Sequence, residues 1–190
     1  MKRVMLSVLA VGLMLSAKAQ VFKESLGVVS ANTSVADHQN AKGFANSATL
    51  KFSGSAELQT NGSSLNKYTA GKDPASGGAN LRFANVEGTD FVISGINTSG
   101  INAPVLGFGL LKNSMASNGS ELAVEYSADK GKTWVGVKFP PLATGEGTGL
   151  VYQYRVTSVL PKTANLSIRF RQTSNSVVFR LDDISVSASE

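Results

Sequence analysis

The apolar residues of this 190-residue chain come in short runs, and turn-forming residues separate each run from the next. Glycine, serine, asparagine and threonine fill the gaps, which recur every 8 to 15 positions along residues 20–190. This spacing is typical of a sandwich or barrel of many short strands. The expected strands are Val21–Leu26, Ala48–Phe52, Ala56–Thr60, Ala79–Ala84, Phe91–Ser94, Val105–Lys112, Glu121–Ser127, Thr133–Phe139, Leu150–Thr157, Asn165–Gln172 and Val177–Val186.

Several of these segments alternate apolar and polar residues, which buries one face of a strand and exposes the other. The residues predicted to point inward are Leu122, Val124, Tyr126, Leu150, Tyr152, Tyr154, Val156, Leu166, Ile168 and Phe170. Those predicted to point outward include Glu125, Gln153, Arg155, Arg169 and Arg171. Two half-buried antiparallel sheets packed face to face satisfy this pattern, so the sequence predicts an all-β sandwich.

Three other segments complete the expected organisation. Residues 1–19 have the pattern of a secretory signal peptide, with Lys2 and Arg3, an apolar run and small residues before a cut after Ala19. Residues 20–190 then form one domain, without a transmembrane segment, that is exported to the periplasm, the outer surface or the medium. A short helical turn fits Ala36–Lys42, and the polar stretch Asn61–Asn80 is predicted to be an exposed loop.

Composition excludes several classes of function. The chain has no cysteine, which excludes thiolate metal sites, disulfides and a cysteine nucleophile. The signal peptide contains three of the 18 basic residues and none of the 13 acidic ones, so the remaining chain has a formal charge of +2. That charge argues against a nucleic-acid partner, because such binding needs a dense basic surface.

The segment Ser127–Trp134 matches the Asp-box pattern S-x-D-x-G-x-T-W. Asp129 is expected to accept backbone N–H bonds across a hairpin connection, Gly131 to take a positive φ, and Trp134 to fold over the ribbon. The segment resembles the Asp boxes of sialidase propellers, where the motif is structural. A propeller would need several copies, and this chain has one.

The last strand changes phase at two aspartates. Phe179 and Leu181 share one phase of the alternation and Ile184 and Val186 share the other, which predicts a bulge at Asp182-Asp183. Adjacent carboxylates at a bulge repel each other. In one interpretation an aspartate points to solvent and its neighbour accepts backbone N–H bonds; in the other, the pair holds a hard cation such as Ca²⁺.

The two ends of the chain carry a family resemblance. The first strand, VFKESL, and the closing motif, FRLDDISV, resemble the secreted MAM-like and carbohydrate-binding jelly-roll modules of Bacteroidetes-type bacteria. The segments GFANSATLKFSGSAELQT, SGGANLRF, FVISGINTSG and ELAVEYSADKGKTW extend it over nearly all of residues 20–190. The resemblance implies a galactose-binding or concanavalin-like jelly roll with adjacent first and last strands. It also implies a structural Ca²⁺ site at Glu24 and Asp182, with Asp183 as the weaker candidate; the disulfide cysteines of MAM domains are absent.

No complete catalytic motif is present. There is no G-x-S-x-G elbow, His38 is expected to be a solvated side chain, and the glycine clusters complete no nucleotide-binding loop. A jelly-roll glycoside hydrolase or lyase stays open, because such an enzyme needs only two suitably spaced carboxylates.

Fold analogy favours a non-catalytic secreted binding module with carbohydrate as its ligand. A protein-interaction or adhesion module of the cell envelope, with a cell-surface protein as partner, is the alternative. The expected ligand surface is the polar face that carries Gln153, Arg155, Arg169 and Arg171, or the loops around Tyr68. Arginines on one sheet face suit the carboxylates or sulfates of an acidic glycan. The competing interpretation is cross-strand pairing of these arginines with Glu57 and Glu125.

Overall fold

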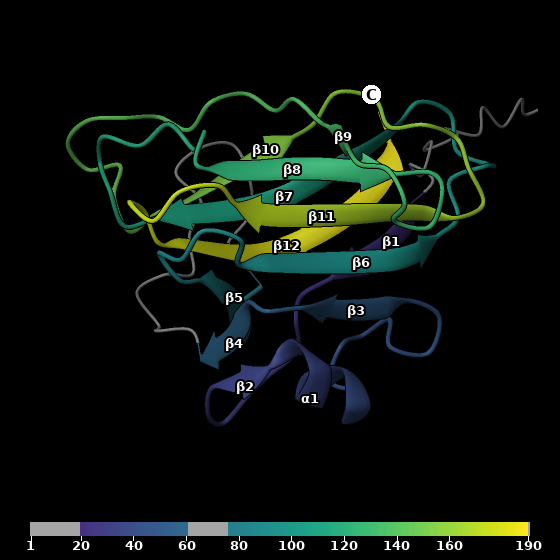
Figure 1. The fold of residues 1–190 in the computed structure, drawn as a ribbon, viewed down its shortest axis with the longest axis horizontal. Helices are drawn as coiled ribbons and strands as arrows, with labels where there is room; N and C mark the ends of the chain where they lie inside the picture. Colours follow the sequence, from purple (N-terminus) through teal and green to yellow (C-terminus); the bar gives the residue numbers. More distant parts are fainter. Residues whose placement is uncertain (1–19, 61–75, 190) are drawn as a thin grey trace, which may run out of the picture.

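The computed structural model describes residues 20–60 and 76–189 and forms two antiparallel sheets packed face to face (Figure 1). The seven-stranded sheet contains β1 (Gln20–Glu24), β2 (Thr33–Ser34), β4 (Glu57–Thr60), β5 (Ala79–Phe83), β7 (Pro104–Lys112), β10 (Tyr152–Val156) and β12 (Phe179–Ala188). The five-stranded sheet contains β3 (Lys51–Gly54), β6 (Asp90–Ile96), β8 (Leu122–Ser127), β9 (Val135–Gly136) and β11 (Leu166–Gln172). This architecture confirms the predicted all-β jelly-roll sandwich.

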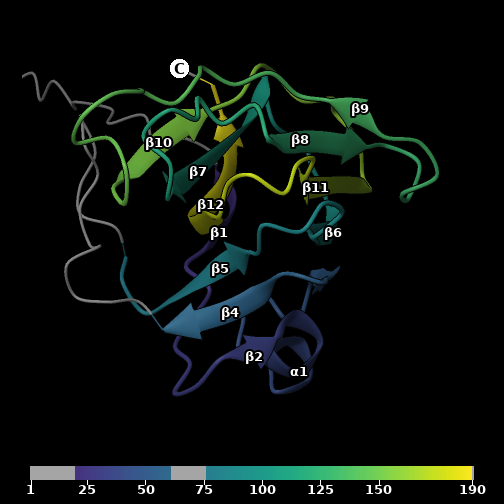
Figure 2. The same cartoon turned by 60° about the vertical axis from the view of Figure 1, so that its left-hand side comes forward.

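One apolar core fills the space between the sheets. Figure 2 shows β7, β10 and β12 on one side and β8 and β11 on the other. Phe108 of β7 meets Phe170 of β11 edge-on across the core, with 5.2 Å between ring centroids. Burying each such side chain contributes about 1.5–3 kcal/mol. The core residues of β8 and β11 are the predicted inward residues Leu122, Val124, Leu166, Ile168 and Phe170, with Tyr126 partly buried against them.

The first and last strands lie side by side, as predicted. β12 pairs with β5 through Phe179–Leu181 and then with β1 through Ile184–Ser187. Its pairing with β7 is shifted between Asp182 and Ser185, and Asp183 has a φ of 49° there. The predicted bulge is therefore the point at which β12 exchanges one neighbouring strand for another.

The segment before β3 covers one edge of the sandwich with a short helix, α1 (Val35–Asn40), close to the predicted helical turn. Ser34 caps α1, because its hydroxyl accepts the backbone N–H of Asp37 at 3.0 Å. His38 on α1 is buried rather than solvated, which corrects the expectation from the polar sequence around it. Its Nε2 lies 3.1 Å from the carbonyl oxygen of Leu26, and its ring meets Phe44 edge-on.

The predicted phase of the strand at Leu150–Thr157 is wrong. Tyr152 and Tyr154 pair with Leu111 and Gly109 of β7, on the face turned away from the core. Gln153 and Arg155 pair with Leu110 and Phe108, which are core residues. The alternation misled because the outer face of this sheet is itself largely buried: all nine residues of β7 are buried, on both faces.

Two further differences concern segment ends. The strand expected at Thr133–Phe139 is reduced to the two residues of β9, and β2 had no sequence signal of its own. The predicted signal peptide at residues 1–19 and most of the predicted Asn61–Asn80 loop, including Tyr68, lie outside the described residues. Within the described part of the chain, no helix has the length and apolar character needed to cross a membrane.

Candidate functional site

Tyr154 of β10 lies across β7 on the outer face of the seven-stranded sheet. Its hydroxyl lies 3.3 Å from the Ser185 hydroxyl of β12, on the far side of β7. Reaching that strand requires the ring to lie over the backbone of Gly107, where an added Cβ would come within 2.1 Å of the tyrosine hydroxyl oxygen. Glycine is therefore required beneath this ring, and the partly exposed Tyr154 is held against the sheet.

Strand register sets Tyr154 among planar polar side chains in two rows. One row crosses the sheet from Glu57 through Arg82, Arg180 and Leu111 to Tyr152. The parallel row two residues along contains Gln59, Asn80, Asp182, Gly109 and Tyr154. We call this surface the tyrosine face. Side chains on one face of neighbouring strands lie close enough to act together.

Hydrogen bonds fix several of these side chains. The Arg180 guanidinium donates to the Asn80 side-chain oxygen at 2.9 Å, and the Asn80 amide donates to the Gln59 carbonyl oxygen at 3.3 Å. The Gln59 amide donates to a Glu57 carboxylate oxygen at 2.8 Å. Glu57, Gln59, Arg82 and Arg180 are partly exposed, whereas Asn80, Asp182 and Tyr152 are buried.

Asp182 has the least compensated carboxylate of the tyrosine face. Its Oδ1 accepts the backbone N–H of Asp183 at 2.8 Å, while its buried Oδ2 has no hydrogen-bond partner within the described residues. Burial, reinforced by the charge of Asp183, raises the pKa of Asp182 to about 8. The Asp183 carboxylate in turn accepts the backbone N–H of Ser76 at 3.0 Å. A second negative charge at this bulge therefore needs a proton or a cation.

Glu24 does not join this pair. It lies opposite the core residue Ile184, whereas Asp182 lies opposite Gly109 on the outer face. The buried Glu24 carboxylate accepts four N–H groups: Oε1 from Leu26 and Ala45 at 3.0 and 3.1 Å, Oε2 from the backbone and side-chain amide of Asn46 at 3.1 and 3.0 Å. A carboxylate has about four acceptor positions, so these donors occupy it fully.

The calcium site expected from the sequence fits the structure only in part. The described residues contain no group of three or more histidine, cysteine, aspartate or glutamate side chains placed to hold a metal ion. Glu24 does not fit as a ligand, because its acceptor positions are filled. Asp182 does fit, because Ca²⁺ prefers carboxylate oxygens and one oxygen of this buried group lacks a donor.

Gln153 and Arg155 bind the segment that runs beside β10 instead of a solvent-exposed surface. The Arg155 guanidinium donates to the carbonyl oxygens of Pro140 and Pro141, each at 2.9 Å. The buried Gln153 side-chain oxygen accepts the Ala143 N–H at 2.7 Å and an Arg155 N–H at 2.7 Å. These side chains attach residues 140–143 along an edge strand, so they are not part of a ligand surface with Arg169 and Arg171.

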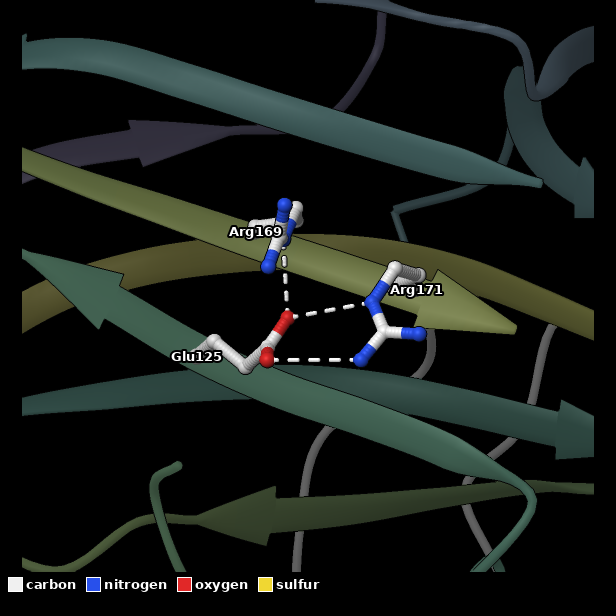
Figure 3. A network of polar contacts seen from close by, with 3 residues as sticks. All are labelled: Glu125, Arg169 and Arg171. Carbon is white, nitrogen blue, oxygen red and sulfur yellow. Dashed lines mark hydrogen bonds and ion pairs between the residues drawn. The ribbon is translucent and has the colours of Figure 1, made fainter. Parts of the chain in front are cut away.

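Arg169 and Arg171 project from β11 on the outer face of the five-stranded sheet, on the predicted side. Both contact Glu125 of β8, as Figure 3 shows. Arg169 Nε donates to Glu125 Oε2 at 2.8 Å, and Arg171 donates to both carboxylate oxygens at 3.4 Å. Burial raises the pKa of Glu125, but the bonds from Arg169 and Arg171 outweigh it, so the pKa is lowered overall. This is the cross-strand pairing that the sequence left as the competing interpretation.

The Asp129 segment forms a hairpin connection after β8. The Asp129 carboxylate accepts the backbone N–H groups of Lys132 and Thr133, at 3.0 and 2.9 Å, and the Thr133 hydroxyl at 2.6 Å. Gly131 takes a φ of 86°, and the Trp134 ring packs 4.2 Å from the Arg169 guanidinium. The position of Trp134 over β11 is the part that the motif alone did not specify.

The comparisons with known proteins found similar solved structures but no family. No family model and no curated protein matches the chain. Among solved structures it is similar to a family 61 carbohydrate-binding module in complex with β-1,4-galactotriose, with a TM-score of 0.46 and 16% identity over 74% of this chain and 88% of that one. The expected membership of a MAM-like family therefore stays a prediction.

Two further solved structures have similar scores. The C-terminal family 22 carbohydrate-binding module of Clostridium thermocellum Xyn10B has a TM-score of 0.44 and 11% identity, over 91% of this chain and 96% of that one. The K3 adhesin domain of Lys-gingipain from Porphyromonas gingivalis has a TM-score of 0.47 and 11% identity, over 90% and 100%.

Proposed function

We propose that this protein is a non-catalytic carbohydrate-binding module, exported by the signal peptide expected at residues 1–19, and that the tyrosine face binds the sugar. The observation that carries the proposal is the ring of Tyr154, held over Gly107 with its hydroxyl near Ser185. The broad apolar faces of a tyrosine ring are suited to stacking on the C–H groups of a pyranose.

Polar side chains of the tyrosine face supply the other half of such a site. Arg82, Arg180, Gln59 and Glu57 are planar and partly exposed, and strand register places them on the same outer sheet face as Tyr154, over β4, β5 and β12. Planar forks of donors and acceptors suit the vicinal hydroxyl groups of a sugar, and internal hydrogen bonds reduce the entropy lost on binding. The combination of one aromatic platform and few oriented polar groups is typical of a small-ligand site.

Retention on immobilised neutral polysaccharides tests the proposal, with xylan, β-1,4-galactan, mannan and cellulose as probes. We expect at least one to bind the protein, and Tyr154→Ala to weaken that binding about tenfold, which corresponds to 1.4 kcal/mol. Tyr154→Phe keeps the ring and loses only the hydroxyl near Ser185, so it should retain most of the affinity. Tyr126→Ala removes a tyrosine packed against the core of the other sheet and is the control for stability.

Two results would overturn the proposal. Equal binding by wild type and Tyr154→Ala would move the site elsewhere, and no retention on any neutral polysaccharide would favour the protein-interaction alternative. Release of reducing ends from a bound polysaccharide would instead favour the hydrolase alternative. Asp182, whose pKa is raised to about 8, would then be the first carboxyl group to substitute.

We further propose that a structural Ca²⁺ binds at the Asp182–Asp183 bulge. The support is the buried Asp182 Oδ2 without a donor and the adjacent second carboxylate. Asp182 and Asp183 would hold the ion, and its charge would compensate the like charges at the point where β12 changes partners.

A further inference from the structure

The outer face of the five-stranded sheet carries a second cluster, formed by Glu125, Arg169, Arg171 and Trp134. Arg169 is fixed on two sides: its Nε donates to Glu125 at 2.8 Å, and its guanidinium lies 4.2 Å from the Trp134 ring centroid. Figure 3 shows both arginines converging on the one carboxylate. Neither arginine takes part in the tyrosine face, which belongs to the other sheet.

Within the part of the chain that the structure describes, these contacts leave most guanidinium donors of the two arginines without a partner. An arginine has five N–H groups, and Arg169 uses only Nε among the contacts of the described residues. Arg171 uses Nε and one terminal nitrogen, both at 3.4 Å. The side chains of Arg169 and Arg171 are 21% and 35% exposed, whereas that of Glu125 is 13% exposed. The donors therefore face solvent, and the acceptor is largely covered.

The charges on this face leave it positive. Glu125 has a lowered pKa and stays ionised, so it compensates one of the two guanidinium groups. Asp90 lies in register with Arg171, but its carboxylate accepts the backbone N–H and hydroxyl of Ser55, at 3.1 and 3.2 Å. Lys51 lies at the exposed end of the same face, opposite Ser94. Lys138 follows Gly136 and Val137 beside β8 and adds an exposed cation on the same side. Among the described residues, the cations of this face therefore outnumber its two engaged carboxylates.

Small side chains surround Arg169 and Arg171 on the outer face of the five-stranded sheet. The register places Ala123, Gly136, Val92, Ser94, Ser127 and Ser167 beside the two arginines. Each of these side chains is smaller than an arginine, and Trp134 is the large neighbour of Arg169. Trp134 is a positioning residue, because its ring fixes Arg169 through a cation–π contact.

We propose that this face is an oxyanion site for the sulfate esters or carboxylates of an acidic polysaccharide, bound by Arg169 and Arg171. Guanidinium forks match both groups bidentately, and a face fixed by Glu125 and Trp134 loses little entropy on binding. The proposal does not depend on the sugar bound by the tyrosine face. It gives the molecule a second, chemically different surface on the opposite side of the sandwich.

The test measures binding of the purified protein to dextran sulfate, polygalacturonate and uncharged dextran at about 0.15 M salt, where exposed charges more than about 8 Å apart are largely screened. We expect binding to one or both charged chains and not to dextran. Arg169→Gln/Arg171→Gln should weaken it at least about tenfold. The matched control, Lys42→Gln/Lys162→Gln, removes two exposed charges outside this cluster and should leave affinity nearly unchanged. Arg171→Lys keeps the charge, removes the fork and should lose several-fold.

Titration with inorganic sulfate separates a polymer site from a site for the free ion. Tight binding of free sulfate that depends on Arg169 and Arg171 would assign the oxyanion itself as ligand, which supports the site. Equal losses in the arginine and lysine variants would show a net-charge effect and overturn it, as would binding that does not distinguish dextran sulfate from dextran. Tyr154→Ala should not alter binding to dextran sulfate, so the two proposals fail separately.

Discussion

At the scale of single residues, two carboxylates show what the backbone can supply in place of a cation. Glu24 accepts four N–H groups and joins β1 to Ala45 and Asn46, which directly follow the core residue Phe44. Asp129 accepts two backbone N–H groups and two hydroxyls across its hairpin. Hydrogen bonds to a carboxylate stabilise its charged form, so Asp129 acts as an acceptor at neutral pH.

Asp129 gives a pH dependence of known sign. Hydrogen bonds from the Thr133 hydroxyl, the Thr133 backbone and Ser127 hold the pKa of Asp129 well below its ordinary value of 3.8. A carboxyl group with a lowered folded-state pKa contributes stability above its unfolded pKa and loses it as pH falls. We expect the thermal midpoint of the wild type to fall below about pH 4. Asp129→Asn should be less stable at pH 7 and should show a smaller fall, measured by circular dichroism from pH 7 to pH 2.

The Asp129 contribution has an internal control. Glu125 also has a lowered pKa, so its protonation lowers stability over the same acidic range in both proteins. The quantity to compare is therefore the difference between wild type and Asp129→Asn at each pH. A difference that stays constant from pH 7 to pH 2 would contradict a role for the Asp129 charge.

At the scale of elements, β10 and β12 show where sequence patterns inform and where they mislead. The phase change at Asp182-Asp183 was readable, because apolar residues fall on both sides of it and the bulge reverses their direction. The phase of β10 could not be predicted from the sequence. Tyr152 and Tyr154 are as apolar as core residues, and Gln153 and Arg155 are as polar as surface residues. Gly107 and Gly109 were the missed signal: paired small residues on one face of β7 leave room for rings from the next strand.

The candidate sites, too, could be predicted from the sequence only in part. Alternation placed Arg169 and Arg171 on the outer face of β11, and the motif gave the hairpin of Asp129. The tyrosine face was not predictable, because it combines five strands that are distant in sequence and depends on their register. The expected partnership of Arg155 with Arg169 failed for the same reason, since a local pattern does not tell which sheet a strand joins.

Arg155 leads to a prediction about a strand edge. β10 ends the seven-stranded sheet, and an uncovered edge invites pairing with another chain. Arg155 and Gln153 attach residues 140–143 to this strand by binding their carbonyl oxygens and one N–H. Arg155→Ala should lower the free energy of unfolding by about 1–3 kcal/mol, the usual value for lost hydrogen bonds to a charged group. Amide exchange in residues 138–143 should accelerate more than exchange in β11.

An exposed arginine elsewhere provides the comparison. Arg171→Ala removes the same side chain from a longer and weaker contact at 3.4 Å, and should change stability by less. Equal exchange rates at residues 138–143 in wild type and Arg155→Ala would show that the segment is held without this side chain. A concentration-dependent rise in light scattering for Arg155→Ala alone would identify edge pairing as the consequence of uncovering β10.

At the scale of the whole molecule, β12 joins three other strands of the seven-stranded sheet. It is bonded to β7 on one side and to β5 and then β1 on the other, so both ends of the described chain meet at one strand. The bulge at Asp182-Asp183 lies at the exchange of partners and directly beneath the tyrosine face. Whatever neutralises these carboxylates therefore affects the closure of the fold and the shape of the sugar surface together.

Calcium should consequently stabilise the whole domain. A ligand that binds only the folded state adds about 2.7 kcal/mol at a concentration 100 times its Kd, and each kcal/mol corresponds to about 2–4 °C for a domain of this size. We expect Ca²⁺ to raise the thermal midpoint at pH 7 by several degrees relative to chelator, measured by scanning calorimetry. Asp182→Asn should abolish this rise, because it removes the oxygen that lacks a donor.

Glu24→Gln decides between the two arrangements of ligands. If Glu24 acts only as the acceptor of four N–H groups, this variant is less stable but keeps the full rise with Ca²⁺. If Glu24 were a ligand, as the family resemblance implied, the rise would disappear in Glu24→Gln as it does in Asp182→Asn. Equal thermal midpoints with Ca²⁺ and with chelator in the wild type would contradict the proposed calcium site. The proton that a pKa of about 8 places on Asp182 would then neutralise the bulge, and the strand exchange of β12 would need no ion.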